Sequence, residues 1–140
     1  MKKTLTLLAA ILAFVTTSFA QTEDGIKWEK KSHDFGSIKM GPKAEVTFRF
    51  TNTTKAPLVI TAANPSCGCT ASEWPKEPVM PGKSAQIKVH YNTANAAPFK
   101  KSIDVFSNDP VNGRVVLYIQ GTVDANAKAE GAKNQPASLP

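Results

Sequence analysis

Apolar and polar residues alternate through most of residues 26–123, and clusters of turn-forming residues separate the alternating runs. Alternation with a period of two predicts β-strands that bury one face each. The clearest strand covers residues 44–51. Its apolar face consists of Ala44, Val46, Phe48 and Phe50. Residues 85–91 and 114–120 repeat the pattern. Their apolar faces consist of Ile87, Val89 and Tyr91 in the first run, and of Val115, Leu117 and Ile119 in the second.

Four weaker runs add to these three strands. They are residues 26–31, 35–38, 58–62 and 102–106. Gly, Pro, Asn and Asp gather between the runs, as turns require. About seven strands with turn signals every 8 to 12 residues are typical of an all-β, immunoglobulin-like two-sheet sandwich. The two distant cysteines of an antibody domain are missing, so packing must hold the predicted core without a bridge between the sheets.

The N-terminal segment has the three parts of a secretory signal peptide. Lys2 and Lys3 form the positive end, residues 5–15 form the apolar stretch, and Ser18 and Ala20 provide small residues before a cut. The apolar stretch is shorter than the roughly 20 residues that span a bilayer, which favours cleavage over an uncleaved anchor. We therefore expect an exported protein, periplasmic or secreted, with no stable membrane insertion after cleavage.

These patterns divide the chain into four parts: a signal peptide over residues 1–20, a short linker over 21–25, the sandwich over 26–123 and a tail over 124–140. The tail contains one large apolar residue, Leu139. It cannot bury enough surface to offset the entropy of ordering it. We expect the tail to be disordered.

Charge and composition argue against several classes of function. The chain has 17 Lys and Arg against 11 Asp and Glu, a formal charge of +6, and loss of Lys2 and Lys3 with the signal would leave +4 (15 against 11). The basic residues are scattered, so no nucleic-acid binding is expected. No Ser/His/Asp arrangement or Gly-rich phosphate loop is recognisable, so the sequence predicts no catalytic residues and no cofactor. An unknown protein or glycan is the expected partner.

Both cysteines of the chain lie in the segment Ser66-Cys67-Gly68-Cys69-Thr70. In an oxidising compartment, one interpretation is a disulfide across Gly68. Closing so short a loop gains only ~1.6 kcal/mol of chain entropy, so such a bond would be labile or reactive rather than a staple. A second interpretation is a soft-metal site for copper or zinc, because thiols at i and i+2 of an extended chain point the same way.

The metal interpretation lacks a full set of ligands, since zinc takes four. The other candidate metal ligands in the chain are His33, His90, Met40 and Met80. Alternation predicts that His90 points out of its strand, and His33 is expected at the surface. The third interpretation is structural: two small apolar thiols lie on one face of a short strand, and Gly68 lets another backbone come close. The sequence leaves all three open.

The segment after the cysteines, residues 73–82, contains three prolines and Trp74. Proline removes donors from a β-ladder, so this segment is expected at an edge or in a loop. Trp74 either packs over the end of the sandwich beside the cysteines or offers an aromatic binding surface to a glycan or peptide. Packing is the favoured interpretation, because single aromatic residues near a core usually pack.

Seven short segments follow one another in a characteristic order. They are His33 to Ile38, Phe48 to Thr53, Pro57 to Ile60, Ser66 to Thr70, Trp74 to Pro78, Pro81-Gly82 and Ser107 to Pro110. Together they resemble the bacterial exported family called domain of unknown function fifteen seventy-three, and the Ser-Cys-Gly-Cys-Thr and Trp-Pro motifs make the resemblance specific. It implies a fold similar to the immunoglobulin-like domains of the abnormal-spindle and hydin type. It implies no activity, because the family has no established biochemical role.

The sequence therefore favours an exported, non-catalytic immunoglobulin-like module that binds a ligand or serves a structural role. The alternative is a thiol–disulfide or soft-metal protein that acts through Cys67, Gly68 and Cys69.

Overall fold

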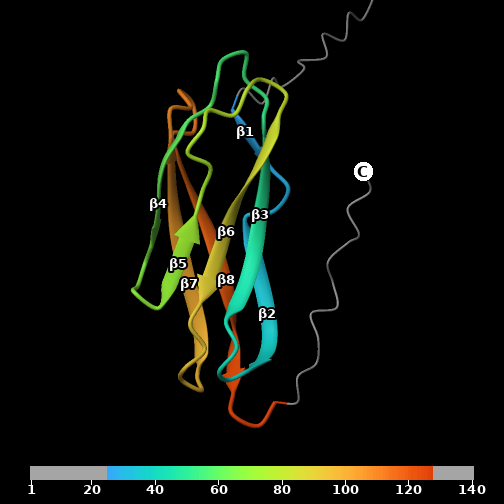
Figure 1. The fold of residues 1–140 in the computed structure, drawn as a ribbon, viewed down its shortest axis with the longest axis vertical. Coiled ribbons are helices and arrows are strands. Elements are labelled where there is room, and N and C mark those ends of the chain that lie inside the picture. Colours follow the sequence, from blue (N-terminus) through green and yellow to red (C-terminus); the bar gives the residue numbers. More distant parts are fainter. Residues whose placement is uncertain (1–24, 128–140) are drawn as a thin grey trace, which may run out of the picture.

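The structure, a computed structural model, describes residues 25–127 as two β-sheets of four strands each (Figure 1). The strands are β1 (Ile26–Trp28), β2 (Ser32–Lys39), β3 (Ala44–Asn52), β4 (Ile60–Pro65), β5 (Thr70–Glu73), β6 (Ser84–Tyr91), β7 (Pro98–Ser107) and β8 (Arg114–Asp124). These residues form no helix, and therefore none that is long and apolar enough to cross a membrane. The predicted signal peptide, nearly all of the linker and the tail after Ala127 lie outside the described residues.

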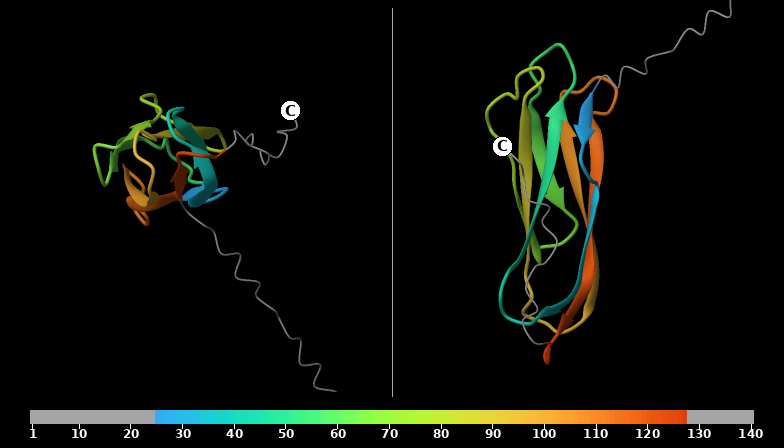
Figure 2. Two further views of the ribbon diagram at one scale, coloured as in Figure 1. Left: turned by 90° about the horizontal axis from the view of Figure 1, so that it is seen from below. Right: turned by 90° about the vertical axis from the view of Figure 1, so that its right-hand side faces the viewer.

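The two sheets face each other across the core, as Figure 2 shows. One sheet has the strand order β1-β3-β6-β5 and the other has the order β2-β8-β7-β4. Neighbouring strands are antiparallel except β2 and β8, which run parallel. β1 and β2 are consecutive in the chain but belong to different sheets, so the chain crosses between layers at the polar residues 29–31. The predicted immunoglobulin-like sandwich is confirmed.

The core consists of large apolar side chains that the two sheets turn toward each other. Among those that are fully buried are Phe48, Phe50, Ile87, Val89, Ile103, Leu117 and Ile119. Two ring contacts add to this packing, since Trp28 lies 5.0 Å from Phe50 and Tyr91 stacks on Phe99 at 3.8 Å between ring centres. The inward faces predicted for β3, β6 and β8 are confirmed. Removal of this apolar area from water is the main force that holds the sheets together.

The strand β5 is absent from the sequence-based prediction. Its four residues, Thr70–Glu73, include no large apolar side chain, and only Thr70 is buried. β5 is an edge strand that backbone hydrogen bonds hold to β6. Because it buries no row of apolar side chains, its sequence shows no strong alternation of apolar and polar residues. Several predicted boundaries also shift. The strand expected at 26–31 ends at Trp28, the one expected at 35–38 spans Ser32–Lys39, and the one expected at 102–106 spans Pro98–Ser107. The strand expected at 58–62 begins at Ile60 and ends at Pro65, and β8 extends to Asp124.

β4 and β5 form edges of opposite sheets, and they lie on the same side of the sandwich (Figure 1). The Ser72 hydroxyl of β5 donates a hydrogen bond to the Ala63 carbonyl of β4 at 2.5 Å. Pro65 ends β4 and has no N–H to offer, which suits an edge position. The turn between these two edge strands contains both cysteines.

Candidate functional site

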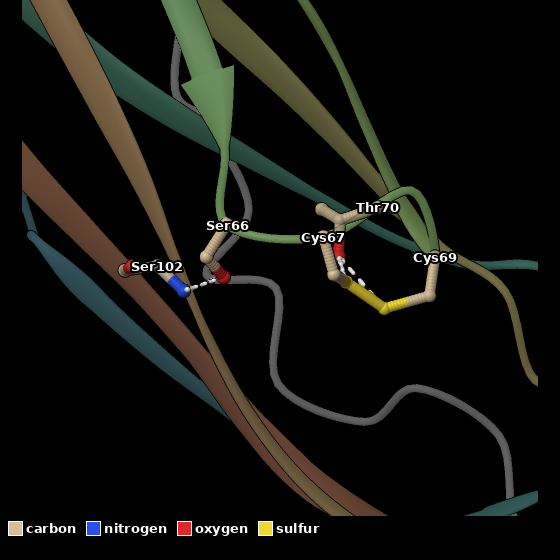
Figure 3. The surroundings of a disulfide bond; sticks show 5 residues. All are labelled: Ser66, Cys67, Cys69, Thr70 and Ser102. Carbon is tan, nitrogen blue, oxygen red and sulfur yellow. Dashed lines mark hydrogen bonds between the residues drawn. A yellow bond between two sulfur atoms is a disulfide. The ribbon is translucent and has the colours of Figure 1, made fainter.

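The cysteine turn, residues 66–69, carries the chain from β4 in one sheet to β5 in the other. Figure 1 shows it on the side of the sandwich, between the two strands. Within it, Cys67 and Cys69 form a disulfide across Gly68 (Figure 3). Their Cα atoms lie 5.3 Å apart, and the Thr70 amide donates a hydrogen bond to the Cys67 carbonyl at 3.3 Å. This backbone bond closes the turn around the disulfide.

Hydrogen bonds outside the disulfide fix both ends of the cysteine turn. Before it, the Ser66 amide donates to the Ser102 carbonyl of β7 at 2.9 Å, and the Ser102 amide donates to the Ser66 hydroxyl at 3.2 Å. After it, the Asn92 amide donates to the Cys69 carbonyl at 2.8 Å. The disulfide adds only ~1.6 kcal/mol of loop-closure entropy, because its ring spans three residues. The turn therefore keeps its path largely through bonds to the neighbouring strands.

The Thr70 hydroxyl lies beside both sulfur atoms. Its Oγ1 is 3.6 Å from the Cys67 Sγ and 3.9 Å from the Cys69 Sγ, and the residue is 4% exposed (Figure 3). Such a hydroxyl can donate a hydrogen bond to either sulfur once that sulfur carries negative charge. Sequence reasoning missed this role. Thr70 stands in the same five-residue motif, but only the folded turn aims its hydroxyl at the disulfide.

Gly68 forms the exposed tip of the cysteine turn. A Cβ atom added there would meet no heavy atom within 4 Å, and the backbone does not adopt a positive φ. The interpretation in which Gly68 admits a close backbone is therefore wrong. Its placement of the thiols on a strand is also wrong, since residues 66–69 form a turn. Both cysteines are half-buried, and Cys69 packs against the hydrophobic core.

The soft-metal hypothesis gains no further ligand from the part of the chain that the structure describes. No group of three or more His, Cys, Asp and Glu side chains among residues 25–127 is arranged to hold a metal ion. The ring nitrogens of His90 lie 3.2 Å from a Glu45 oxygen and 3.4 Å from a Glu73 oxygen. His33 Nδ1 lies 3.3 Å from Lys30 Nζ. Both histidines thus contact residues other than the cysteine pair.

Trp74 follows β5 directly, whereas Cys69 precedes β5 directly. An extended chain of this length separates the two residues by roughly 15 Å. Trp74 therefore packs at the other end of β5 from the cysteines. Trp74 is half-buried against the core, and the Lys76 Nζ lies 3.2 Å from the centre of its ring. A binding role for Trp74 stays a prediction.

A groove of about 380 Å³ opens between the loops 54–58 and 108–111, which sequence reasoning did not connect. We call it the loop-end groove. Its apolar lining consists of Ala56, Pro57, Leu58, Pro110 and Val111. Val111 is 65% exposed. Met80 is also exposed, at 53%, and it follows Val79, which forms a β-bridge with the groove residue Leu58. Exposed apolar side chains therefore gather around a concave surface.

The strand order, the two facing sheets and the apolar core define this chain as an immunoglobulin-like domain. The family model described as "Protein of unknown function (DUF1573)" matches residues 26–123, and the chain belongs to this family. The resemblance drawn from the sequence motifs is confirmed. No curated protein matches the chain significantly.

Three solved structures illustrate the shared fold. A protein of unknown function from Porphyromonas gingivalis W83 has a TM-score of 0.63 at 12% identity, and the match covers 71% of this chain and 46% of that one. Domain 7 of human CEP192, an ASH/PapD-like domain, has a TM-score of 0.56 at 10% identity over 72% and 86% of the two chains. The YadV chaperone has a TM-score of 0.51 at 16% identity over 79% and 55%. This chain spans less than half of the Porphyromonas protein, and at these identities the likeness shows the fold alone.

Proposed function

We propose that this protein is an exported, non-catalytic immunoglobulin-like module that binds another polypeptide. The observation that carries the proposal is the loop-end groove, whose apolar lining includes Val111 at 65% exposed. Met80, 53% exposed, follows the residue that bridges to Leu58 of the groove. Exposed apolar side chains that surround a concave surface are typical of interaction sites, because water is displaced from them on binding. The rest of the described chain builds the sandwich that holds the two groove loops in place.

A polypeptide suits the site better than a glycan. Trp74, the aromatic surface considered for a glycan or a peptide, has the Lys76 ammonium 3.2 Å from the centre of its ring. The loop-end groove offers apolar side chains instead, which suit the apolar side chains of a polypeptide. Among the similar folds, one belongs to a chaperone, a class of proteins that acts on other polypeptides. Both points favour a protein partner.

Export is supported by the sequence of the first 20 residues. Lys2 and Lys3, the apolar residues 5–15 and the small residues Ser18 and Ala20 together suit a cleavable signal. The intact mass of the protein recovered outside the cytoplasm is expected to match a chain that begins at Gln21. Recovery of the full-length chain in the cytoplasm alone would contradict export.

Binding is tested by charge substitutions at opposite ends of the sandwich. Met80→Asp with Val111→Asp places charge at the loop-end groove. Met40→Asp is the matched control, because Met40 is 40% exposed and its amide bonds to the carbonyl of Asp124 at the far end of β8. In cross-linking of the exported protein in intact cells, the groove variant is expected to lose a partner that the control keeps. Equal cross-linking of both variants would refute the groove as the binding site.

A further inference from the structure

We propose that the Cys67–Cys69 disulfide is a thiol–disulfide exchange site that accepts two electrons from a dithiol in another exported polypeptide. This inference goes beyond the proposed binding function, because it does not depend on the loop-end groove. It rests on three features of the cysteine turn: the anchoring of its ends, its exposure and the position of Thr70.

The anchoring shows that the fold does not need the disulfide to hold the turn. Ser66 is bonded to Ser102 of β7, and the Cys69 carbonyl accepts a hydrogen bond from Asn92. A bond that closes a ring with one residue between the cysteines constrains the unfolded chain little. Such a disulfide is given up to an attacking thiol more readily than a structural one. The protein can therefore be reduced at this site and stay folded.

The exposure of the turn decides which sulfur is attacked. Gly68 has open space around its outer side, so an incoming thiolate can approach the tip of the turn. Cys69 packs against the hydrophobic core, which covers part of its side chain. Cys67 is half-buried and is not among the residues of that packing. Attack therefore falls on the Cys67 Sγ.

The exchange proceeds in two balanced steps. A thiolate of the partner bonds to the Cys67 sulfur, the S–S bond breaks, and Cys69 leaves as a thiolate that takes up a proton. The second partner thiolate then attacks the first partner sulfur, which forms the partner disulfide and releases Cys67 as a thiolate that is protonated in turn. Two electrons and two protons pass from the partner dithiol to the cysteine pair.

Thr70 serves each leaving group in turn. Its hydroxyl lies 3.9 Å from the Cys69 Sγ, which leaves first, and 3.6 Å from the Cys67 Sγ, which leaves second (Figure 3). Burial of Thr70 holds the hydroxyl beside both sulfurs. A hydrogen bond to a developing thiolate lowers the barrier to its departure, because it stabilises the charge.

The experiment uses the oxidised protein from residue 21 to 140 and a reduced linear peptide with two cysteines. The reaction is quenched with acid, free thiols are alkylated, and intact masses are followed over time. The protein is expected to gain two alkylated thiols while the peptide loses the mass of two hydrogen atoms. Exchange is also expected to be at least about tenfold faster than for the excised disulfide peptide Ser-Cys-Gly-Cys-Thr, which lacks the folded turn.

Two threonine variants separate a role in exchange from a role in folding. Thr70→Val is expected to slow exchange about tenfold, and Thr70→Ser is expected to restore the wild-type rate because it keeps the hydroxyl. Thr61→Val, at an exposed position on β4, is the matched control and is expected to react like wild type. Unchanged peptide thiols, a protein no faster than the excised peptide, or a folded Thr70→Val that reacts at the wild-type rate would each overturn the proposal.

Discussion

Asn52 is the buried polar residue that connects the end of β3 to the loop-end groove. Its side chain is fully buried and its Nδ2 donates to the carbonyls of Ala56 and Val79, both at 2.8 Å. Its Oδ1 accepts from the Thr54 amide at 2.9 Å and from the Thr54 hydroxyl at 2.7 Å. One side chain thus holds together the segment of Val79 and the loop 54–58, which lines the groove.

Asn52→Ala is expected to lower the free energy of unfolding by about 3 kcal/mol. The Thr54 hydroxyl has one proton and also lies 2.8 Å from the Ala56 carbonyl, so we count three full hydrogen bonds to the Asn52 side chain. Each contributes about 1 kcal/mol net, and the Val79 carbonyl loses its side-chain donor in a dry environment, which adds to the cost.

Urea unfolding of the mature protein, followed by the signal of its two tryptophans, measures this change. Asn64→Ala at an exposed position on β4 is the control and is expected to stay within about 0.5 kcal/mol of wild type. The Asn52 variant is also expected to lose the partner that binds the groove. A loss of stability no larger than that of the Asn64 control would refute the assignment of Asn52 as the organiser of these loops.

Reduction of the Cys67–Cys69 disulfide is expected to lower the free energy of unfolding by no more than about 1.6 kcal/mol. A larger loss in urea titrations with reductant would contradict the anchoring of the turn by hydrogen bonds. Gly121→Ala is expected to lower the free energy of unfolding by about 1–3 kcal/mol, measured by thermal unfolding. The added Cβ would lie 3.0 Å from a backbone carbonyl of β2 and 3.1 Å from an aromatic ring of β7. An unchanged stability would show that β2 moves to accommodate the methyl group. Burial lowers the pKa of His33 below its ordinary 6.5, and the ammonium of Lys30 lowers it further. The stability that the neutral ring contributes is therefore complete above pH 6.5, and it is lost as the pH falls from 6.5 toward the pKa in the folded protein. The NMR titration of His33 is expected to have a midpoint below 6.5 that Lys30→Gln moves upward, and a midpoint unaffected by that change would contradict the assignment.

Strands that bury one face could be predicted from the sequence, and the edge strand could not. β3, β6 and β8 show apolar residues at every second position because each presents one face to the core, as in Phe48 and Phe50. β5 consists of small and polar residues and is held by backbone hydrogen bonds to β6. Backbone bonds do not require particular side chains, so they produce no pattern in the sequence. The same limit applies to Thr70, whose burial at 4% depends on strands that lie elsewhere in the sequence.

The sequence by itself determined the inward faces of the main strands, the family and the short distance between Cys67 and Cys69, because these features depend on residues close together in the chain. Only the tertiary structure decided that the loops 54–58 and 108–111 form one groove and that the Thr70 hydroxyl faces both sulfurs. The physical reason is that periodicity and spacing report local geometry. Contacts between distant segments arise from how the two sheets pack, and that packing depends on all the buried side chains together.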